Sequence, residues 1–420
     1  MNQLVHIIQT PPFWLKTPPL SLIYLKTYLK NQGISVTVSD LNLELFKLMQ
    51  PSLGQWLSLN KDFETKLFSK VEKQYPQLLN KLCNDIGQTQ YIGFSLFKRN
   101  FSFAFSLAKL INKRFSNKTI IFGGPHTLFL DKEGTLDENY YWVIGEGEKP
   151  LLEIANGSQN KIYRFQELDN LDDLKTYDFS PLKSNQYSKT LPLLSSRGCP
   201  YQCNFCSERL LYKKFRYHSP QYIIEQIRSL QSKYKTTNFV FLDSLINYKH
   251  EWLYDFCSLV IKNNLNIKWE AQIRIEKNFS LQLAKLLKES GCYNLFVGLE
   301  SGCDKVLELM NKGFTASCAV DFFKILKAAQ LHFEISLIFG YPGEGKKEFQ
   351  ETLSFISGNK KLIPKIAQAN PFTDYFDDFL DQPFLKGQTK KKIEIFLKIL
   401  EEEKIKYTRS FINNLTYPCA

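Results

Sequence analysis

The sequence has no run of about 18 apolar residues, the minimum for a helix that crosses a bilayer, so no membrane span is expected. Its first nine residues read as a strand and lack the basic-then-apolar layout of a secretion signal. No internal repeat of fixed period is present, which argues against solenoids and propellers. The net charge of +12 comes mainly from lysines dispersed along the chain, so no nucleic-acid partner is expected.

Cysteine is sparse and unevenly distributed. Only nine cysteines occur in 420 residues, and an odd number at scattered positions argues against a disulfide framework. Three of them, Cys199, Cys203 and Cys206, fall within eight residues. In a chain without a secretion signal, such crowding indicates metal binding in a reducing, cytoplasmic compartment.

The first part of the chain alternates strand and helix signals. Apolar, β-prone segments occur at residues 4–9, 36–40, 91–97, 119–122 and 141–144. Helical periodicity occurs at 20–31 and 101–114, and residues 57–86 form an added helical insert. Alternating strands and helices favour a parallel sheet, so the sequence predicts an α/β, doubly wound, Rossmann-like domain over residues 1–155.

A polar, weakly periodic connector is expected at residues 156–190, and a second alternating series follows it. Its expected strands are residues 191–196, 239–243, 267–273, 293–299, 333–339 and 365–369. Helical patterns at 221–233 and 316–329 lie between them. Six such units predict a partial TIM-like barrel over residues 191–370. Residues 371–420 form a short C-terminal region with one basic amphipathic helix, about 390–404.

The cysteine cluster directly follows the first strand of the second series, and barrel enzymes place their chemistry at such strand ends. Three thiolates on a short loop can bind three irons of a cubane cluster and leave the fourth iron open. A structural zinc site is the competing interpretation. It usually needs four ligands, and no second C-x-x-C pair lies nearby.

The spacing C-x-x-x-C-x-x-C after a first barrel strand resembles the radical S-adenosylmethionine (SAM) superfamily, including an aromatic residue, Phe205, before the last cysteine. The resemblance implies a 4Fe–4S cluster whose open iron binds the amino and carboxylate groups of SAM. It also implies an external electron donor such as flavodoxin or ferredoxin. One electron then breaks the sulfonium bond and produces a 5′-deoxyadenosyl radical, which abstracts hydrogen from a substrate.

Later strand ends carry further matches to the family. The segment from Gly298 to Gly302 resembles the family's ribose- and amino-binding segment, and the turn from Gly340 to Glu344 resembles the one beside the adenine. Arg274 follows the third strand of this series and can pair with the methionyl carboxylate of SAM. Each match alone is also compatible with a tight turn or a surface charge. The SAM-binding residues expected are Phe205, Asp243, Arg274, Glu300, Ser301 and Gly340.

The first domain resembles the cobalamin-binding domain found upstream of some radical barrels, and the resemblance over both domains covers about residues 1–360. Its matching pieces stand at strand ends, where glycines allow a large flat cofactor to approach the backbone. The expected cobalamin-binding residues are Asp40, Asn42, Ser95, Gly123, Gly124, His126, Gly145 and Glu146.

One departure from that family pattern concerns the cobalt ligand. Many cobalamin domains use D-x-H-x-x-G, but here Asn42 stands at the histidine position and no glycine follows. Cobalamin is therefore expected without a histidine beneath the cobalt. His126 is the one histidine beside a strand end and is equally compatible with a structural role. A degenerate domain that binds no cofactor also stays open.

The combination predicts a cobalamin-dependent radical SAM methyltransferase acting on an unactivated carbon. A radical cyclisation or rearrangement on the same architecture, and a non-catalytic redox sensor, remain alternatives. A methylthiotransferase is disfavoured because the first domain holds only Cys83. The brevity of residues 371–420 favours a large or exposed substrate, such as a peptide or a carrier-bound molecule, or a partner protein; a small molecule also stays possible.

Overall fold

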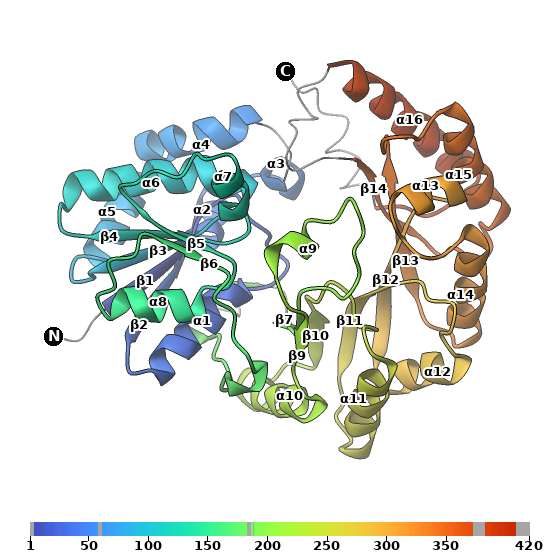
Figure 1. Ribbon diagram of the computed structural model, residues 1–420, viewed down its shortest axis with the longest axis horizontal. Coiled ribbons are helices and arrows are strands. Elements are labelled where there is room, and N and C mark those ends of the chain that lie inside the picture. Colours follow the sequence, from blue (N-terminus) through green and yellow to red (C-terminus); the bar gives the residue numbers. More distant parts are fainter. Residues whose placement is uncertain (1–3, 58–60, 183–185, 188, 373–382, 409–420) are drawn as a thin grey trace. The chain divides into compact units, whose positions relative to one another are not determined.

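The structure is a computed structural model that describes residues 4–57, 61–182, 186–187, 189–372 and 383–408. The chain forms two compact units (Figure 1). The first extends to Leu191 and includes the short segment Leu211–Lys213. The second comprises Pro192–Leu210 and the chain from Lys214 onward. Each unit is built around its own sheet of six strands.

The sheet of the first unit has the strand order β2-β1-β3-β4-β5-β6, and all its neighbouring strands are parallel. Its strands are β1 (Leu4–Gln9), β2 (Ser35–Asp40), β3 (Tyr91–Ser95), β4 (Thr119–Gly123), β5 (Tyr141–Ile144) and β6 (Ile162–Arg164). The order reverses at β1, so the switch point of this doubly wound sheet lies between β1 and β3. The predicted Rossmann-like fold is confirmed. The sequence missed β6, which is short and lies inside the predicted connector.

Helices cover both faces of this sheet, with α1 packed on α8 on one face and α4 packed on α5 and α6 on the other (Figure 1). The helices are α1 (Leu20–Asn31), α2 (Leu41–Met49), α3 (Leu53–Leu57), α4 (Lys61–Gln74), α5 (Pro76–Asp85), α6 (Phe101–Arg114), α7 (Thr127–Lys132) and α8 (Glu148–Ala155), with 3-10 turns η1 (Lys98–Asn100), η2 (Leu171–Asp173) and η3 (Ser180–Leu182). Because both faces are covered, β3 and β5 are buried along their whole length.

The second unit contains a curved sheet with the order β14-β13-β12-β11-β10-β7. Its strands are β7 (Thr190–Leu193), β10 (Asn238–Phe241), β11 (Lys268–Ile273), β12 (Cys292–Glu300), β13 (Phe333–Phe339) and β14 (Ile366–Pro371). The pairs from β10 to β14 are parallel, and chain order equals spatial order. This is the partial barrel that the sequence predicts, with all strand carboxyl ends at one edge.

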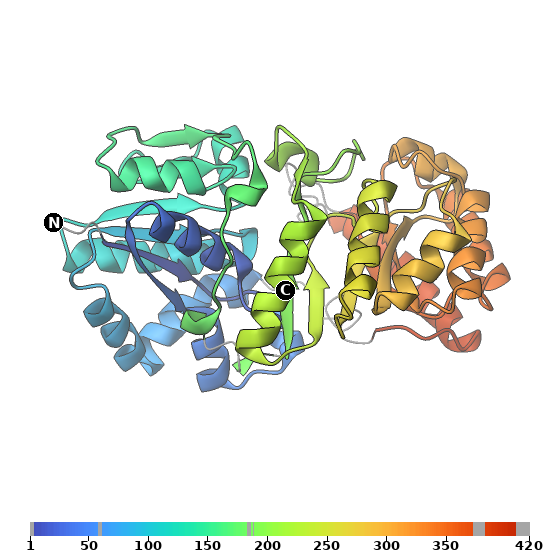
Figure 2. The same cartoon turned by 90° about the horizontal axis from the view of Figure 1, so that it is seen from below.

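The longer helices of the second unit lie on the outside of its curved sheet, whereas α9 lies on the cysteine loop (Figures 1 and 2). They are α9 (Glu208–Leu211), α10 (Pro220–Tyr234), α11 (His250–Lys262), α12 (Leu281–Glu289), α13 (Asp304–Leu309), α14 (Ala316–Ala328), α15 (Lys346–Gly358) and α16 (Pro383–Glu402). No helix in the described ranges is both long enough and apolar enough to cross a membrane.

The first barrel strand ends earlier than the sequence suggests. The expected strand was residues 191–196, but β7 stops at Leu193. Ser196 and Arg197 instead form β8, which pairs antiparallel with β9 (Arg216–Tyr217). The apolar pattern continued past the end of β7, and only the tertiary pairing reveals the change of direction. As a result, a two-stranded hairpin closes the base of the loop that carries the cysteines.

The C-terminal helix α16 packs on the barrel through one apolar stripe. Ile393, Phe396 and Leu400 are buried, and the Phe396 ring lies 5.0 Å from the Phe339 ring of β13. The spacing of three and four residues is that of one helix face. The helix starts earlier than the predicted position near residue 390.

Replacing Phe396 with alanine should destabilise the protein by roughly 3–5 kcal/mol, because a fully buried aromatic ring leaves a cavity. Ile395 is the matched control: it neighbours Phe396 on the same helix, but 41% of it is exposed. Ile395→Ala should change stability by less than about 0.5 kcal/mol. Urea unfolding of the full chain measures both variants, and equal effects would contradict this packing of α16.

Candidate active site

The three clustered cysteines lie on the loop between β8 and β9, just after the first barrel strand. All three are free thiols; Cys203 is buried, and Cys199 and Cys206 are half-buried. Burial raises the pKa of Cys199 above its usual value and that of Cys206 to about 11. The unliganded Cys199 and Cys206 thiols are therefore protonated at neutral pH, and iron binding would release their protons.

The donor set fits an iron–sulfur cluster. Within the described residues, no three or more His, Cys, Asp or Glu side chains converge on a single metal ion. A cubane cluster does not require such convergence, because each of its cysteine thiolates binds a different iron. Three thiolates on one loop also leave one iron without a protein ligand.

The cysteine loop is tied to the segment that follows α13. The Asn204 backbone N–H donates to the Met310 carbonyl at 3.0 Å, and the Asn204 side chain donates to the Leu309 carbonyl at 2.9 Å. In return, the Asn311 side chain donates to the Gln202 carbonyl at 2.8 Å. These three hydrogen bonds therefore attach the cysteine loop to the connection that follows β12 and α13.

Phe205 contributes to the same attachment. Its ring packs against the buried cluster of Cys303, Val306 and Met310. The ring centroid also lies 5.6 Å from the Lys312 ammonium. The residue predicted to contact SAM thus also anchors the cysteine loop.

Asp243 lies just beyond β10 and is fully buried. Its carboxylate accepts the Ser195 backbone N–H at 3.0 Å, the Ser195 hydroxyl at 2.7 Å and the Ser196 hydroxyl at 2.6 Å. Burial raises the pKa of Asp243 to about 6, although the hydrogen bonds act in the opposite direction. The sequence predicted a SAM contact here, but these bonds give Asp243 the role of positioning the chain that enters the cysteine loop.

Glu300 ends β12 in an irregular backbone conformation. The register with β13 shifts between Gly298 and Glu300, and Glu300 has a φ of +71°. The bulge turns its carboxylate toward Ser336, whose hydroxyl donates at 3.1 Å. A Cβ on Gly298 would lie 2.6 Å from the Glu300 Oε1 atom, so glycine is required there.

Lys312 is the partner of Glu300 that the sequence did not reveal. Its Nζ lies 3.4 Å from the Glu300 Oε1 atom, and the two side chains are only 6% and 10% exposed. The Phe314 ring centroid lies 5.4 Å from the same ammonium. Lys312 stands in a polar loop away from any strand end, so no local pattern marks it. The strand-end carboxylate therefore carries a compensating buried cation.

Ser301 and Gly340 serve the packing of neighbouring helices. The Ser301 hydroxyl lies 3.0 Å from the Thr352 hydroxyl of α15 and accepts the Cys303 N–H at 3.1 Å. Gly340 has a φ of +79°, and a Cβ there would lie 2.3 Å from the Thr389 Oγ1 atom of α16. The structure does not bring the Ser301 hydroxyl to the cysteine loop, and its contact with SAM stays a prediction.

A buried ion pair holds the turn after β13. Glu344 accepts the Gly340 N–H at 2.6 Å and the Lys392 ammonium of α16 at 2.7 Å. Burial raises the pKa of Glu344, although Lys392 acts in the opposite direction. The turn predicted beside the adenine is thereby fixed to the C-terminal helix.

Arg274 follows β11 and reaches the cysteine loop. Its Nη1 atom donates to the Cys203 sulfur at 3.3 Å, and its guanidinium lies 3.9 Å from the centroid of the Tyr201 ring. The sequence assigned Arg274 to the methionyl carboxylate of SAM. The structure places it beside a predicted iron ligand, and its contact with SAM stays a prediction.

In the first unit, the predicted cobalamin-binding residues follow the carboxyl ends of four parallel strands. Asp40, Ser95 and Gly123 end β2, β3 and β4. The others lie just beyond strands β2, β4 and β5: Asn42, Gly124, His126, Gly145 and Glu146. Doubly wound sheets bind ligands at this edge, next to the switch point. The topology therefore brings the predicted set to one edge of the sheet.

Asp40 and Asn42 at this edge form hydrogen bonds with other residues of the chain. Asp40 caps α2 by accepting the Leu43 N–H at 3.0 Å, and burial raises its pKa to about 6. The Asn42 Oδ1 atom accepts the Phe13 N–H at 2.8 Å and the Trp56 indole N–H at 3.0 Å. These two bonds use the Asn42 oxygen within the protein and leave it no role as a cobalt ligand.

Glu146 and the glycines at the same edge also serve the protein itself. The Glu146 carboxylate accepts the Leu168 N–H at 2.9 Å. Gly124 has a φ of +100°, and a Cβ there would lie 2.7 Å from the Leu96 carbonyl oxygen. A Cβ on Gly145 would lie 3.3 Å from the Phe165 Cα atom. The sequence attributed these glycines to the approach of a cofactor, but the backbone already requires two of them.

His126 is a neutral imidazole at this edge. Burial lowers its pKa to about 4, and its ring centroid lies 5.2 Å from that of Phe101. The Nδ1 atom is buried and has no hydrogen-bond partner among the described residues. The ring is therefore uncharged at neutral pH, and one of its nitrogens has no partner.

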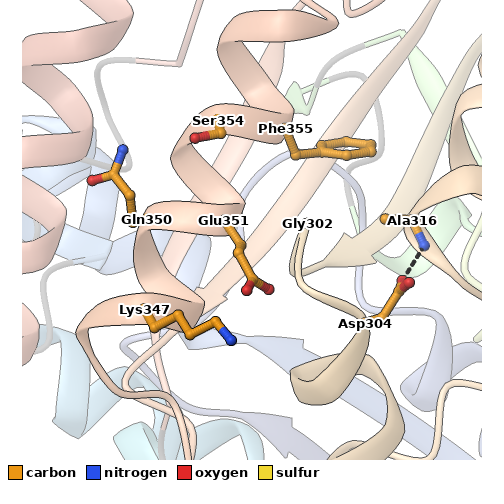
Figure 3. A pocket seen from close by; sticks show the side chains of 8 residues that line it. All are labelled: Gly302, Asp304, Ala316, Lys347, Gln350, Glu351, Ser354 and Phe355. Atoms are coloured by element: carbon orange, nitrogen blue, oxygen red, sulfur yellow. Dashed lines mark hydrogen bonds between the residues drawn. The ribbon is translucent and has the colours of Figure 1, made fainter.

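A pocket opens on the outer side of the barrel, between α15 and the segments around α13 and α14 (Figure 3). Its lining residues are Gly302, Asp304, Ala316, Lys347, Gln350, Glu351, Ser354 and Phe355. None of the predicted cluster or SAM residues lines it, so this pocket is not part of the site described above.

The three-cysteine loop follows the first strand of the partial barrel, which is where β/α barrels carry their functional residues. Residues 193–356 match the Radical SAM superfamily. The chain is 29% identical over 299 residues to the uncharacterized methyltransferase PH0819 of Pyrococcus horikoshii, across 65% of this chain and 64% of the relative. It is 28% identical over 282 residues to bacteriochlorophyllide d C-12(1)-methyltransferase of Chlorobaculum tepidum, across 63% and 60%.

A solved structure shares the fold. The radical SAM methyltransferase TsrM from Kitasatospora setae, with cobalamin and a 4Fe–4S cluster bound, matches with a TM-score of 0.69 at 15% identity, across 88% of this chain and 75% of that one. The Radical SAM match covers barrel strands β10 to β13 and the cysteine motif that predicted it. A match to this family implies a 4Fe–4S cluster and SAM. The chain spans 60–64% of the length of the two curated relatives.

Lys312→Met should destabilise the protein by about 3–5 kcal/mol, because it leaves the buried Glu300 carboxylate without its cation. Lys305→Met is the matched control: its ion pair with Glu348 is 2.8 Å long, but the lysine side chain is 62% exposed. The control should unfold at the wild-type urea concentration. A Lys312 variant with wild-type stability would show that Glu300 does not depend on this pair.

Proposed function

We propose that the chain is a cobalamin-dependent radical SAM methyltransferase that acts on an unactivated carbon. The observation that carries the proposal is the loop of three free cysteines at the end of the first barrel strand, preceded in the chain by a doubly wound sheet with a ligand-binding edge. Both curated relatives are named as methyltransferases, which supports the reaction type.

In this proposal, Cys199, Cys203 and Cys206 hold the cluster, which supplies one electron for cleavage of the sulfonium bond of SAM. The remaining residues orient the reactants. Asp243 fixes the entry to the cysteine loop, and the Glu300 carboxylate can accept hydrogen bonds from the ribose hydroxyls or the ammonium of SAM. The Gly340 turn would support the adenine.

Buried polar atoms of the first unit that have no hydrogen-bond partner among the described residues support the proposal that this unit binds cobalamin. At the carboxyl end of β1 and the start of α2, the Gln9 Oε1, Thr10 Oγ1 and Asn42 Nδ2 atoms are buried and have no partner among the described residues. Buried polar atoms normally have partners, and the corrin ring carries amide groups that both donate and accept. Bound cobalamin would supply methyl transfer through its cobalt.

No protein imidazole is assigned beneath the cobalt. Asn42 stands at the position where related domains have a histidine, and its oxygen already accepts two hydrogen bonds. His126 is neutral and has an unpartnered nitrogen, which makes it the specific alternative to test.

The substrate class proposed is a small molecule, a peptide or a carrier-bound molecule. We further propose a reducing cytoplasmic location, because the thiols of the site must stay free, and an electron donor such as flavodoxin or ferredoxin. Anaerobic turnover with candidate substrates tests the reaction type. Gain of one methyl group supports the proposal, a product of unchanged carbon number indicates cyclisation or rearrangement, and no 5′-deoxyadenosine indicates a sensor.

Cys199→Ala, Cys203→Ala and Cys206→Ala should each abolish reductive formation of 5′-deoxyadenosine, because each removes one iron ligand. Cys318→Ala is the control, since Cys318 is a half-buried free thiol on α14 outside the loop. Iron content and 5′-deoxyadenosine are measured after anaerobic reconstitution. A triple variant that retained about four irons per chain and normal SAM cleavage would refute the assignment.

The first unit should retain cobalamin without nitrogen ligation from the protein. Protein purified with hydroxocobalamin is reduced to Co(II) and examined by electron paramagnetic resonance, with His126→Ala as the comparison. The expected spectra of both proteins lack superhyperfine splitting from a protein imidazole. Splitting that disappears in His126→Ala would make His126 the ligand, and complete absence of bound corrinoid would indicate a degenerate domain.

A further inference from the structure

Arg274 contacts one of the three cysteines directly. Its Nη1 atom donates to the Cys203 sulfur at 3.3 Å, although the two residues are 71 positions apart in the chain. Cys203 is also the most buried of the three. The sulfurs of Cys199 and Cys206 accept backbone N–H groups, from Tyr201 and Glu208. Among the described residues, Cys203 is thus the proposed iron ligand whose sulfur accepts a hydrogen bond from a charged side chain.

The guanidinium is held in this position from behind by an aromatic ring of the cysteine loop. The Tyr201 ring centroid lies 3.9 Å from the Arg274 Cζ atom. The Tyr201 hydroxyl donates to Glu276 at 2.9 Å, and the second Glu276 oxygen lies 2.6 Å from the His250 imidazole. Because Tyr201 is itself fixed at its far end, the stacked guanidinium has little freedom to turn away from the sulfur.

The backbone of Arg274 is fixed as firmly as its side chain. Its N–H donates to the Asn247 side-chain oxygen at 3.0 Å, and the Asn247 amide donates back to the Arg274 carbonyl at 2.9 Å. Asn247 is only 1% exposed. Arg274 is thus constrained at both ends before any ligand binds.

We propose that Arg274 is a positioning residue for the cluster: it holds the Cys203 thiolate and raises the reduction potential of the cluster, rather than binding the SAM carboxylate. The inference rests on the proposed cluster site but not on cobalamin or on methyl transfer. Reduction adds one electron to the cluster and changes no bond at Cys203. A hydrogen bond to a ligating sulfur and a permanent positive charge both stabilise the more negative, reduced state.

A different cation is available for the part of the site where SAM is expected. Lys312 lies beside the Glu300 carboxylate at 3.4 Å. The pair presents one positive and one negative group at the predicted SAM strand end. Arg274 is therefore not the sole cation of the described site, and its contact with Cys203 can be its main role.

The test compares Arg274→Met and Arg274→Lys with wild type in the full-length, anaerobically reconstituted protein. Arg228→Met is the matched control, because Arg228 is exposed on α10 and its side chain donates to Asn263 at 2.6 Å, away from the cysteine loop. Three quantities are measured: iron content, the midpoint potential of the cluster by redox titration monitored by electron paramagnetic resonance, and the Kd for SAM by equilibrium binding.

Arg274→Met should keep its iron but require a more negative potential for reduction, with a Kd for SAM within about threefold of wild type. Arg274→Lys should lie between the two, since lysine keeps the charge but loses the planar fork. The control should match wild type. If Arg274→Met does not assemble the cluster, Arg274→Lys provides the comparison.

An unchanged midpoint potential in the iron-loaded variants would overturn the inference. If the potential is unchanged while affinity for SAM falls about tenfold or more, Arg274 binds the SAM carboxylate instead. Failure of the proposed methyltransferase function gives a different result: wild type would lack bound corrinoid or methylated product, while the potential would still shift in Arg274→Met.

Discussion

The cysteine loop depends on one buried carboxylate. Asp243 binds the backbone of Ser195 and the hydroxyls of Ser195 and Ser196, which lie three and two positions before Gly198 at the start of the loop. These bonds coincide with the point where the chain leaves β7 and turns into the β8–β9 hairpin. Burying the Asp243 carboxylate without such donors would cost several kcal/mol. The change of chain direction after β7 is what brings the donors of Ser195 and Ser196 to it. The positions of the three cysteines follow from that turn.

The same principle recurs around the barrel rim. Each buried charge has a partner from another element: Glu300 has Lys312, and Glu344 has Lys392 of α16. Breaking such a pair leaves an uncompensated charge, which costs more than the pair contributes. The strand ends proposed to bind SAM are therefore rigid because their charges are already satisfied within the protein. Arg274 extends this arrangement to the cysteine loop by stacking on Tyr201 and donating to Cys203.

In both sheets the predicted site residues lie at the carboxyl ends of the strands for the same reason, although the two sheets differ in topology. All strands of a parallel sheet point the same way, so the loops after them gather at one edge. In the first unit the strand order reverses at β1, and the unpartnered atoms of Gln9, Thr10 and Asn42 lie next to that reversal. In the second unit the order is sequential, and the sheet curves into a partial barrel.

The sequence by itself determined the order of strands and helices, the two-part α/β architecture and the cysteine motif. Helical periodicity located α1 and α6 at their observed bounds, and β5 was likewise recognised from its apolar run. These features are local: each is written within about a dozen consecutive residues, because hydrophobic period and ligand spacing are properties of a short segment.

The tertiary structure alone decided where the site's side chains point. Glu300 meets Lys312 only because a β-bulge turns its carboxylate, and the hydroxyl of Ser301 meets α15 rather than the cysteine loop. Arg274 reaches Cys203 across 71 positions of chain. Gly124 likewise has no room for a Cβ atom, because the backbone of Leu96, from another segment of the chain, lies against it. Such contacts join residues from different strand ends, and no periodicity within one segment encodes them.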